Sequence, residues 1–141
     1  MEVIYTTVAT TKGGRNANVK SEDGIINMEL RAPKEMGGEG GDYTNPEQLF
    51  AAGYSACFDS AINYVAMQKR MRIASEVTVK LKTGNNGKGG FMFAVEMDVV
   101  ISGLEQKEAE ELIKEADQVC PYSNSIRGNV DVKFNITTIE K

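Results

Sequence analysis

The chain has 141 residues, the length of one ordinary domain, and 41% of them are hydrophobic, which is enough to build a core. Its net charge of −4 argues against a nucleic-acid binder, because no basic stripe is present to replace phosphate counterions. The sequence contains no run of 18 apolar residues and no secretory signal, so we expect no membrane partner and a cytoplasmic location.

Histidine is absent from the sequence, which excludes Ser-His-Asp triads, Cys-His pairs and His-ligated zinc sites. Two cysteines, Cys57 and Cys120, are few for a secreted domain that is stabilised by disulfides. They fit a reducing compartment better, where a cysteine pair is more often reactive than structural. We therefore expect no metal and no bound cofactor, and any nucleophile must be activated by something other than imidazole.

The first 44 residues combine two alternating segments with glycine-rich turns. Alternation of apolar and polar residues indicates strands, and paired glycines or Asp-Gly indicate turns. In chain order we predict a strand over 2–10, a break at Gly13-Gly14, a tight turn at Asp23-Gly24, a strand over 25–31 and a mobile glycine-rich loop over 32–44.

A strong helix signal follows this loop. Asn45 suits the N-cap, Pro46 the first helical position and Gln48 the reciprocal capping position. The helix is predicted over residues 46–69, with a possible kink at Gly53. It is apolar on nearly every side and is therefore expected to be buried in a core or against a partner; the apolar residues are Leu49, Phe50, Ala52, Ala56, Cys57, Phe58, Ala61, Ile62, Val65 and Ala66.

The second half of the chain predicts a hairpin, a helix and a last strand. The hairpin comprises strands over 76–83 and 91–101 joined by residues 85–90. Ser102 and Glu105 form the pattern of a capping box before an amphipathic helix, which Pro121 ends just after Cys120. The inward residues of that helix are Ala109, Leu112, Ile113, Ala116 and Val119, and the last strand contains Val130, Val132, Phe134 and Ile136.

This order of elements predicts an α+β fold: antiparallel sheet, a long buried central helix and a second amphipathic helix, in one domain over residues 1–141. The central helix has apolar surface on several sides, and one sheet with one short helix is insufficient to cover it. We therefore expect an intertwined homodimer.

Cys57 has two interpretations. It is either a small buried hydrophobic residue or a nucleophile, and the nucleophile must be a thiolate. Burial raises a thiol pKa, so a reactive Cys57 needs a cationic neighbour. Arg15 is the best candidate, because it follows Gly13-Gly14 in a turn that can aim its side chain inward, although an isolated loop arginine is usually solvated.

Glu47 can hold that arginine in a bidentate pair, or it can simply complement the helix dipole. Glu47 and Cys57 are ten residues apart, which is about 15 Å along a straight helix. One arginine therefore cannot contact both on one unbroken helix. Either the helix breaks near Gly53 or Glu47 comes from the other subunit, and we favour the second alternative.

Cys120 is either a hydrophobic residue at a helix end or a resolving thiol that attacks a sulfenic acid on Cys57. The segment Cys120-Pro121-Tyr122-Ser123 is not a CxxC motif, so exchange between two cysteines of one turn is excluded. Cys57 is the only other cysteine in the sequence.

Two motifs resemble those of the organic hydroperoxide resistance (Ohr) proteins of the OsmC/Ohr superfamily. They are TNPEQLFAAGYSACF over residues 44–58 and VCPYSN over 119–124, the latter followed by RGNVDV over 127–132. The resemblance covers essentially the whole chain and implies an OsmC/Ohr-like fold. One departure is that Asn16 and Ala17 stand where the family often carries Asp and Gly.

The resemblance also implies a chemistry. Cys57 would be the peroxidatic and Cys120 the resolving cysteine, with Arg15 and Glu47 activating the thiol at the interface of an interdigitated homodimer. The substrates would be organic, including fatty-acid, hydroperoxides, and the reductant a dithiol such as a lipoyl group on a protein. Phe50, Phe58 and Met36 are hypothetical substrate contacts that select organic over inorganic peroxide.

Two other functions remain open. The first is a binding module that closes on an apolar ligand, with both cysteines structural and unreactive at neutral pH. The second is a thiol-disulfide oxidoreductase that acts on protein disulfides without consuming peroxide, against which the absence of a CxxC motif argues.

Overall fold

The computed structural model describes residues 1–139, which fold as two compact units. Unit 1 comprises Met1–Leu49 and unit 2 begins at Phe50, so the division falls near the start of the long helix α1 (Pro46–Gln68). This division does not by itself test the predicted single domain.

Unit 1 contains a three-stranded antiparallel sheet in the order β1 (Ala9–Lys12), β2 (Asn18–Ser21) and β3 (Asn27–Glu29). The predicted strand over 2–10 is wrong in extent, because β1 pairs with β2 only from Ala9 onward. The strand predicted over 25–31 is reduced to three residues, and β2 was not predicted. A strand exists where it finds a pairing partner, and alternation in the sequence does not identify that partner.

Glycines form the turns of unit 1. Gly13 and Gly14 have φ of 88° and 69°, in the left-handed region, and lead into the short 3₁₀ helix η1 (Gly14–Asn16). The predicted turn at Asp23-Gly24 is confirmed, since the Gly24 N–H donates to the Ser21 carbonyl at 2.9 Å. Residues 32–44 form the predicted loop, which includes the 3₁₀ helix η2 (Lys34–Met36).

The start of α1 confirms most of the capping prediction. The Asn45 side-chain oxygen accepts the Gln48 N–H at 2.8 Å, and Pro46 is the first helical residue. The Gln48 side chain, however, accepts a hydrogen bond from the Thr44 hydroxyl at 3.0 Å rather than reaching back to the Asn45 backbone. The reciprocal half of the predicted cap is therefore replaced by a contact between side chains.

Unit 2 contains β4 (Ala74–Asn85), β5 (Phe91–Ser102) and β6 (Val132–Ile139), joined by the helices α2 (Gln106–Val119) and α3 (Pro121–Ile126). The predicted hairpin is confirmed, because β4 and β5 pair antiparallel over twelve residues each. The prediction of a purely antiparallel sheet is wrong: β6 pairs parallel with β5. Parallel neighbours require a crossover connection, which α2 and α3 supply.

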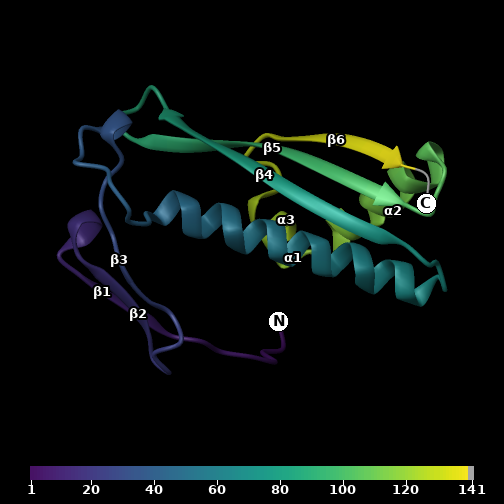
Figure 1. Cartoon of the computed structure of the whole chain (residues 1–141), viewed down its shortest axis with the longest axis horizontal. Coiled ribbons are helices and arrows are strands. Elements are labelled where there is room, and N and C mark those ends of the chain that lie inside the picture. Colours follow the sequence, from purple (N-terminus) through teal and green to yellow (C-terminus); the bar gives the residue numbers. More distant parts are fainter. Residues whose placement is uncertain (140–141) are drawn as a thin grey trace. The chain divides into compact units, whose positions relative to one another are not determined.

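The core of unit 2 lies on one face of this sheet, where α1 and α2 pack against alternate residues of β5 (Figure 1). Phe50 packs on Phe93 of β5 and Phe58 on Phe134 of β6, with ring centroids 5.1 and 5.4 Å apart. The buried hydrophobic residues of the unit are Tyr54, Phe58, Ala61, Ile62, Val65, Ala66, Val95, Met97, Val99, Ile101, Ala109, Leu112, Ile113, Ala116 and Cys120.

Two further predictions need correction. The capping box of α2 comprises Glu105 and Glu108 rather than Ser102 and Glu105, and Val119 is exposed rather than inward. In the single chain α1 is buried along one side, and Met67 on another side is 68% exposed. The predicted burial of this helix is confirmed for the side in the core, and burial of the remainder against a partner stays a prediction. The pattern of α2 identified its other four inward residues correctly.

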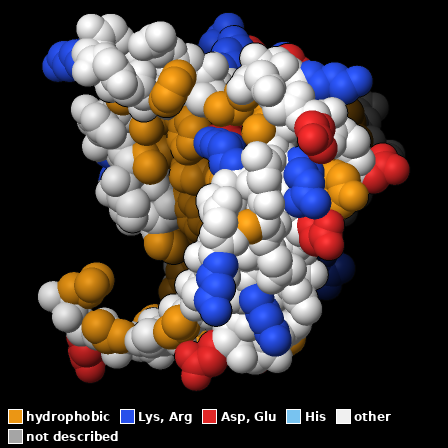
Figure 2. Space-filling view, turned by 90° about the vertical axis from the view of Figure 1, so that its left-hand side faces the viewer, with side chains coloured by type: hydrophobic (Ala, Val, Ile, Leu, Met, Phe, Trp, Pro, Cys, Tyr) orange, Lys and Arg blue, Asp and Glu red, His pale blue; other side chains and the backbone are white. Residues whose placement is uncertain are grey.

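The surface carries charges of both signs. On the face drawn in Figure 2, Lys and Arg side chains are interspersed with Asp and Glu rather than gathered into one basic area. Among residues 1–139, no helix combines the length and the apolar character needed to cross a bilayer.

Gly53 causes no break in α1, which is continuous from Pro46 to Gln68. Its lack of a side chain instead admits Tyr122, because a Cβ atom at residue 53 would overlap the Tyr122 hydroxyl and lie 3.0 Å from Cζ. The Tyr122 ring is itself stacked on Tyr54, with centroids 5.6 Å apart, and contacts Phe50 edge-on. The ring therefore cannot move aside without losing these contacts.

We expect Gly53→Ala to destabilise the protein by about 1–3 kcal/mol, the usual cost of overpacking, although alanine is the better helix former. Urea denaturation measures the change in the free energy of unfolding. Gly84→Ala is the matched control, because no atom lies within 4 Å of a Cβ built at Gly84. A Gly53→Ala variant as stable as Gly84→Ala would contradict the close packing of Tyr122.

Candidate active site

The two cysteines lie together in unit 2. The sulfur atoms of Cys57 and Cys120 are 3.6 Å apart, and both residues are free thiols. Cys57 is partly exposed on α1, whereas Cys120 is fully buried, with 0% of its surface exposed. A disulfide has an S–S bond of about 2.05 Å, so a small approach of the two side chains would be enough to form it.

Cys120 lies at the joint between α2 and α3. Its N–H donates to the Ala116 carbonyl at 3.0 Å and so ends α2, while Pro121 begins α3. The predicted position at the end of the helix is thus confirmed, but α3 itself was not predicted. The Cys120 carbonyl accepts the Asn124 N–H at 3.0 Å, which ties the cysteine to the first turn of α3.

The surroundings of the thiols in unit 2 do not favour a thiolate. Burial raises the pKa of Cys57, and the close contact with the Cys120 sulfur raises it further. The backbone N–H of Tyr122 acts in the opposite direction and lowers this pKa. A reactive thiolate at neutral pH therefore requires additional positive charge at Cys57.

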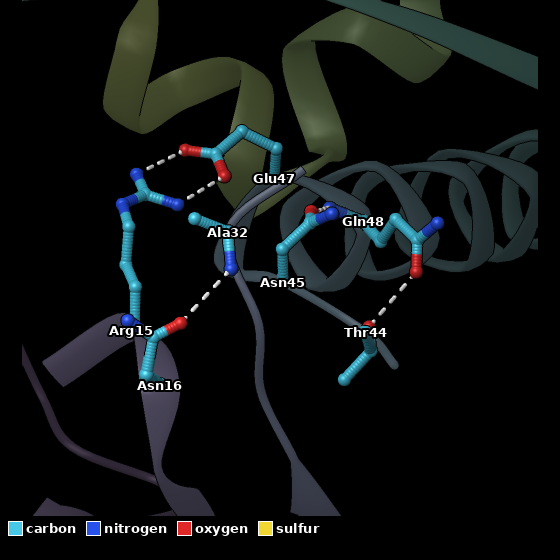
Figure 3. Close-up of polar contacts among 7 residues, drawn as sticks. All are labelled: Arg15, Asn16, Ala32, Thr44, Asn45, Glu47 and Gln48. Carbon is cyan, nitrogen blue, oxygen red and sulfur yellow. Dashed lines mark hydrogen bonds and ion pairs between the residues drawn. The ribbon is translucent and has the colours of Figure 1, made fainter. Parts of the chain in front are cut away.

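Arg15 and Glu47 form a bidentate ion pair within unit 1 (Figure 3), which is one of the two interpretations of Glu47 that the sequence left open. The two guanidinium nitrogens Nη1 and Nη2 donate to Oε1 and Oε2, both at 2.6 Å. The hydrogen bonds from Arg15 lower the pKa of Glu47, and the same contact raises the pKa of Arg15. Both groups are therefore charged at neutral pH, and the planar guanidinium is held in one orientation.

Local structure explains how Arg15 reaches Glu47. The left-handed Gly13 and Gly14 turn the chain so that Arg15 lies in η1, and Glu47 lies in the first turn of α1. The side-chain oxygen of Asn16 accepts the Ala32 N–H at 3.5 Å (Figure 3). An aspartate at residue 16 would accept the same hydrogen bond through its carboxylate. The presence of Asn16 in place of aspartate therefore keeps the hydrogen bond from the Ala32 N–H available.

The structure brings the predicted residues together as two pairs, Cys57 with Cys120 and Arg15 with Glu47. A break of the helix near Gly53 is wrong, since α1 is continuous. The alternative, in which Glu47 comes from a second subunit, stays a prediction. Because Arg15 and Glu47 pair within one chain, a Glu47 contributed by a second subunit would bring Arg15 with it.

The three hypothetical substrate contacts lie in different surroundings. Phe50 is partly buried among aromatic side chains of unit 2, and Met36 is exposed in unit 1. Phe58 has no exposed surface, so a substrate could contact it only if the core opened. The role of all three in substrate selection stays a prediction.

Sequence reasoning assigned no role to Tyr54 on α1 or to Tyr122 and Ser123, which lie on α3 shortly after Cys120. The Tyr54 hydroxyl and the Ser123 hydroxyl are hydrogen-bonded at 2.7 Å, and both residues are buried. The signal that could have found them is their spacing, because Tyr54 lies three residues from Cys57 and Ser123 three residues from Cys120.

Within residues 1–139, fold and site together define an α+β protein with two sheets, three α-helices and a pair of free cysteines in contact. The model of the OsmC-like protein family matches residues 38–135. The organic hydroperoxide resistance protein of Xanthomonas axonopodis pv. citri is 44% identical over 136 residues, which is 96% of each chain.

Solved structures agree with this assignment. An organic hydroperoxide resistance protein from Elizabethkingia anophelis is 48% identical, with a TM-score of 0.95 over 99% of this chain and 100% of that one. The organic hydroperoxide resistance protein OhrB of Bacillus subtilis is 38% identical, with a TM-score of 0.86 over 94% and 98%. The chain belongs to the OsmC-like family, among the relatives named organic hydroperoxide resistance proteins.

Proposed function

We propose that the protein is a thiol peroxidase that reduces organic hydroperoxides to alcohols and so defends the cell against oxidative stress. The observation that carries this proposal is the contact between one accessible and one buried thiol, 3.6 Å apart. The accessible Cys57 can meet a peroxide, and the buried Cys120 can meet only the product formed on Cys57. The names of the relatives, which refer to organic hydroperoxide resistance, support the class of substrate.

The proposed reduction of the hydroperoxide has three steps. The Cys57 thiolate attacks the distal oxygen of ROOH, the O–O bond breaks, and the alkoxide leaves and takes up a proton to give ROH. The Cys120 thiol then attacks the Cys57 sulfenic acid, an S–S bond forms, and the hydroxyl leaves as water. A dithiol reduces the Cys57–Cys120 disulfide by exchange and is itself oxidised to a cyclic disulfide.

Activation of Cys57 is assigned to Arg15, held by Glu47. The guanidinium would stabilise the thiolate and polarise the peroxide, which opposes the effect of burial on the pKa of Cys57. We place the Arg15–Glu47 pair of one subunit beside the thiols of the other in an intertwined homodimer. Large apolar side chains exposed in the single chain support such a partner: Ile4 and Tyr5 in unit 1, and Tyr64 and Met67 on α1.

The reductant is proposed to be a lipoyl dithiol carried on a protein. Two thiols on one molecule complete the exchange without a second encounter, which gives the second step a high effective concentration. A cytoplasmic location fits this cycle, because a reducing compartment returns both cysteines to thiols between turnovers. No bound cofactor takes part in any of the steps.

The test is a peroxidase assay with cumene hydroperoxide as substrate and dihydrolipoamide as reductant, with hydrogen peroxide as the comparison substrate. We expect catalytic turnover, and a higher kcat/KM for the organic substrate. A protein with verified free thiols that reduces no hydroperoxide would support the binding module instead. Reduction of protein disulfides without any consumption of peroxide would support the thiol-disulfide oxidoreductase.

A further inference from the structure

A buried hydrogen bond joins α1, which carries Cys57, to α3, which begins directly after Cys120. Tyr54 on α1 and Ser123 on α3 are bonded through their hydroxyls at 2.7 Å, with 0% and 3% of their surfaces exposed. Tyr54 precedes Cys57 by three residues, and Ser123 follows Cys120 by three residues. The hydroxyl pair and the thiol pair are therefore two successive contacts between α1 and the Cys120–Ser123 turn, about one helical turn apart.

The Tyr54 side chain has little freedom to move. Its ring stacks on Tyr122 at an interplanar angle of 20° and meets Phe50 edge-on. Burial raises the pKa of the Tyr54 phenol, and the hydroxyl therefore stays protonated and able to donate. A buried phenol hydroxyl without a hydrogen-bond partner costs free energy of folding. The position in which the Ser123 hydroxyl bonds Tyr54 is therefore favoured.

Cys120 depends on this docking for its own position. It lies at the joint of two helices in an extended conformation, with φ of −64° and ψ of 119°, rather than inside a regular helix. Its only disulfide partner is Cys57, whose sulfur must come from 3.6 Å to bonding distance. A small displacement of α3 would move Cys120 away from Cys57 and lower the rate of that approach.

We propose that Tyr54 and Ser123 are positioning residues for the resolving step. Their hydrogen bond holds the start of α3 against α1, so that Cys120 condenses with the oxidised Cys57 before a second peroxide converts the sulfenic acid to sulfinic acid. The consequence for peroxide turnover rests on the proposed function, whereas the consequence for closing the Cys57–Cys120 disulfide does not.

The first test measures disulfide closure without peroxide. Wild-type protein, Ser123→Ala and Tyr54→Phe are equilibrated with mixtures of reduced and oxidised dithiothreitol, and the fraction of disulfide is read by thiol alkylation and mass spectrometry. We expect the equilibrium constant for disulfide formation to fall about three- to tenfold in each variant, the range for loss of one hydrogen bond. The double variant should lose no more than either single one, since both remove the same bond.

Ser125→Ala is the matched control. Ser125 lies on α3 as well, but its hydroxyl donates to the Pro121 carbonyl of the same helix at 2.7 Å and does not bridge to α1. We expect this variant to keep the wild-type equilibrium. Ser123→Ala should also remain folded, because Tyr54 and Ser123 line a hollow of about 260 Å³, which is large enough for water to replace the lost hydroxyl.

The second test titrates the proteins with cumene hydroperoxide and determines the sulfinic acid at Cys57 by mass spectrometry. At equal peroxide we expect about three- to tenfold more sulfinic acid in Ser123→Ala and Tyr54→Phe than in the wild type. The reason is that slower closure of the Cys57–Cys120 disulfide leaves the sulfenic acid exposed to peroxide for longer. The rate constant of the first oxidation should stay within about twofold, because the two hydroxyls bond each other rather than the Cys57 sulfur. A merely structural role would lower stability in urea without changing this partition.

Wild-type values for both the dithiothreitol equilibrium and the sulfinic acid yield would overturn the proposal. If instead the equilibrium shifts as expected but no protein consumes peroxide, the positioning of Cys120 stands and the proposed peroxidase function fails.

Discussion

The Cys57→Ser variant is expected to reduce no organic hydroperoxide above the uncatalysed rate, while it folds as the wild type does. The reason is that Cys57 is the accessible thiol of the pair, and a serine hydroxyl is not ionised at neutral pH. The side chains are nearly equal in size, so the urea midpoint should change little. Turnover of cumene hydroperoxide with dihydrolipoamide, followed by the formation of the alcohol, measures the loss.

Cys120→Ser is the matched variant, and it should behave differently. It should reduce one equivalent of peroxide per Cys57, stop at the sulfenic acid, and then accumulate sulfinic acid as more peroxide is added. Dimedone labelling followed by mass spectrometry detects the sulfenic acid. A single equivalent consumed by Cys57→Ser but none by Cys120→Ser would reverse the assignment of the two cysteines. Equal turnover in Cys57→Ser and wild type would contradict the cycle through a Cys57–Cys120 disulfide.

Removal of the Arg15 guanidinium is expected to raise the pKa of Cys57 by about 1–3 pH units, the effect of one adjacent opposite charge. The pH dependence of alkylation by iodoacetamide reports this pKa. The sign is fixed by the charge: the cation stabilises the thiolate, so alkylation of Arg15→Ala should rise at higher pH than in the wild type. Turnover at pH 7 should fall about 10²–10³-fold, the usual cost of removing one group that stabilises developing negative charge.

Arg31→Ala provides the control for Arg15→Ala. Arg31 lies in the same unit, where its guanidinium stacks over the Tyr43 ring at 4.5 Å, and its loss should leave the pKa of Cys57 unchanged. Glu47→Gln should lie between wild type and Arg15→Ala, since it keeps the cation but removes the carboxylate that orients it. If Arg15→Ala and Arg31→Ala alkylate with the same pH profile, Arg15 does not activate the thiol.

Local elements could be predicted where their signals are local. The Asn45 cap, the length of α1 and the β4–β5 hairpin follow from capping chemistry and residue periodicity over a few neighbours. The predicted extent of the N-terminal strand is wrong because it depends on a non-local signal, the position of its pairing partner. Its alternating residues satisfy the pattern of a strand, but β2 supplies pairing only from Ala9 onward.

Two errors in unit 2 have the same origin. The direction of β6 depends on how the chain returns after α2, and the six-residue helix α3 that makes this return is too short to show a periodic pattern. Gly53 is only a possible kink by its sequence, because glycine is a poor helix former. The packing of Tyr122 against it belongs to a residue far along the chain and is invisible in the local sequence.

The sequence by itself restricted the candidate chemistry: histidine is absent, so any nucleophile must be activated by something other than imidazole, and the two cysteines outside any CxxC motif are its candidate thiols. It also identified Arg15 and Glu47 as a candidate pair. Only the tertiary structure decided that Cys57 is accessible and Cys120 buried, that their sulfurs meet across 63 residues of chain, and that Tyr54 and Ser123 join α1 to α3. Composition and spacing restrict which groups can react, whereas burial and non-local distance arise only when distant segments pack together.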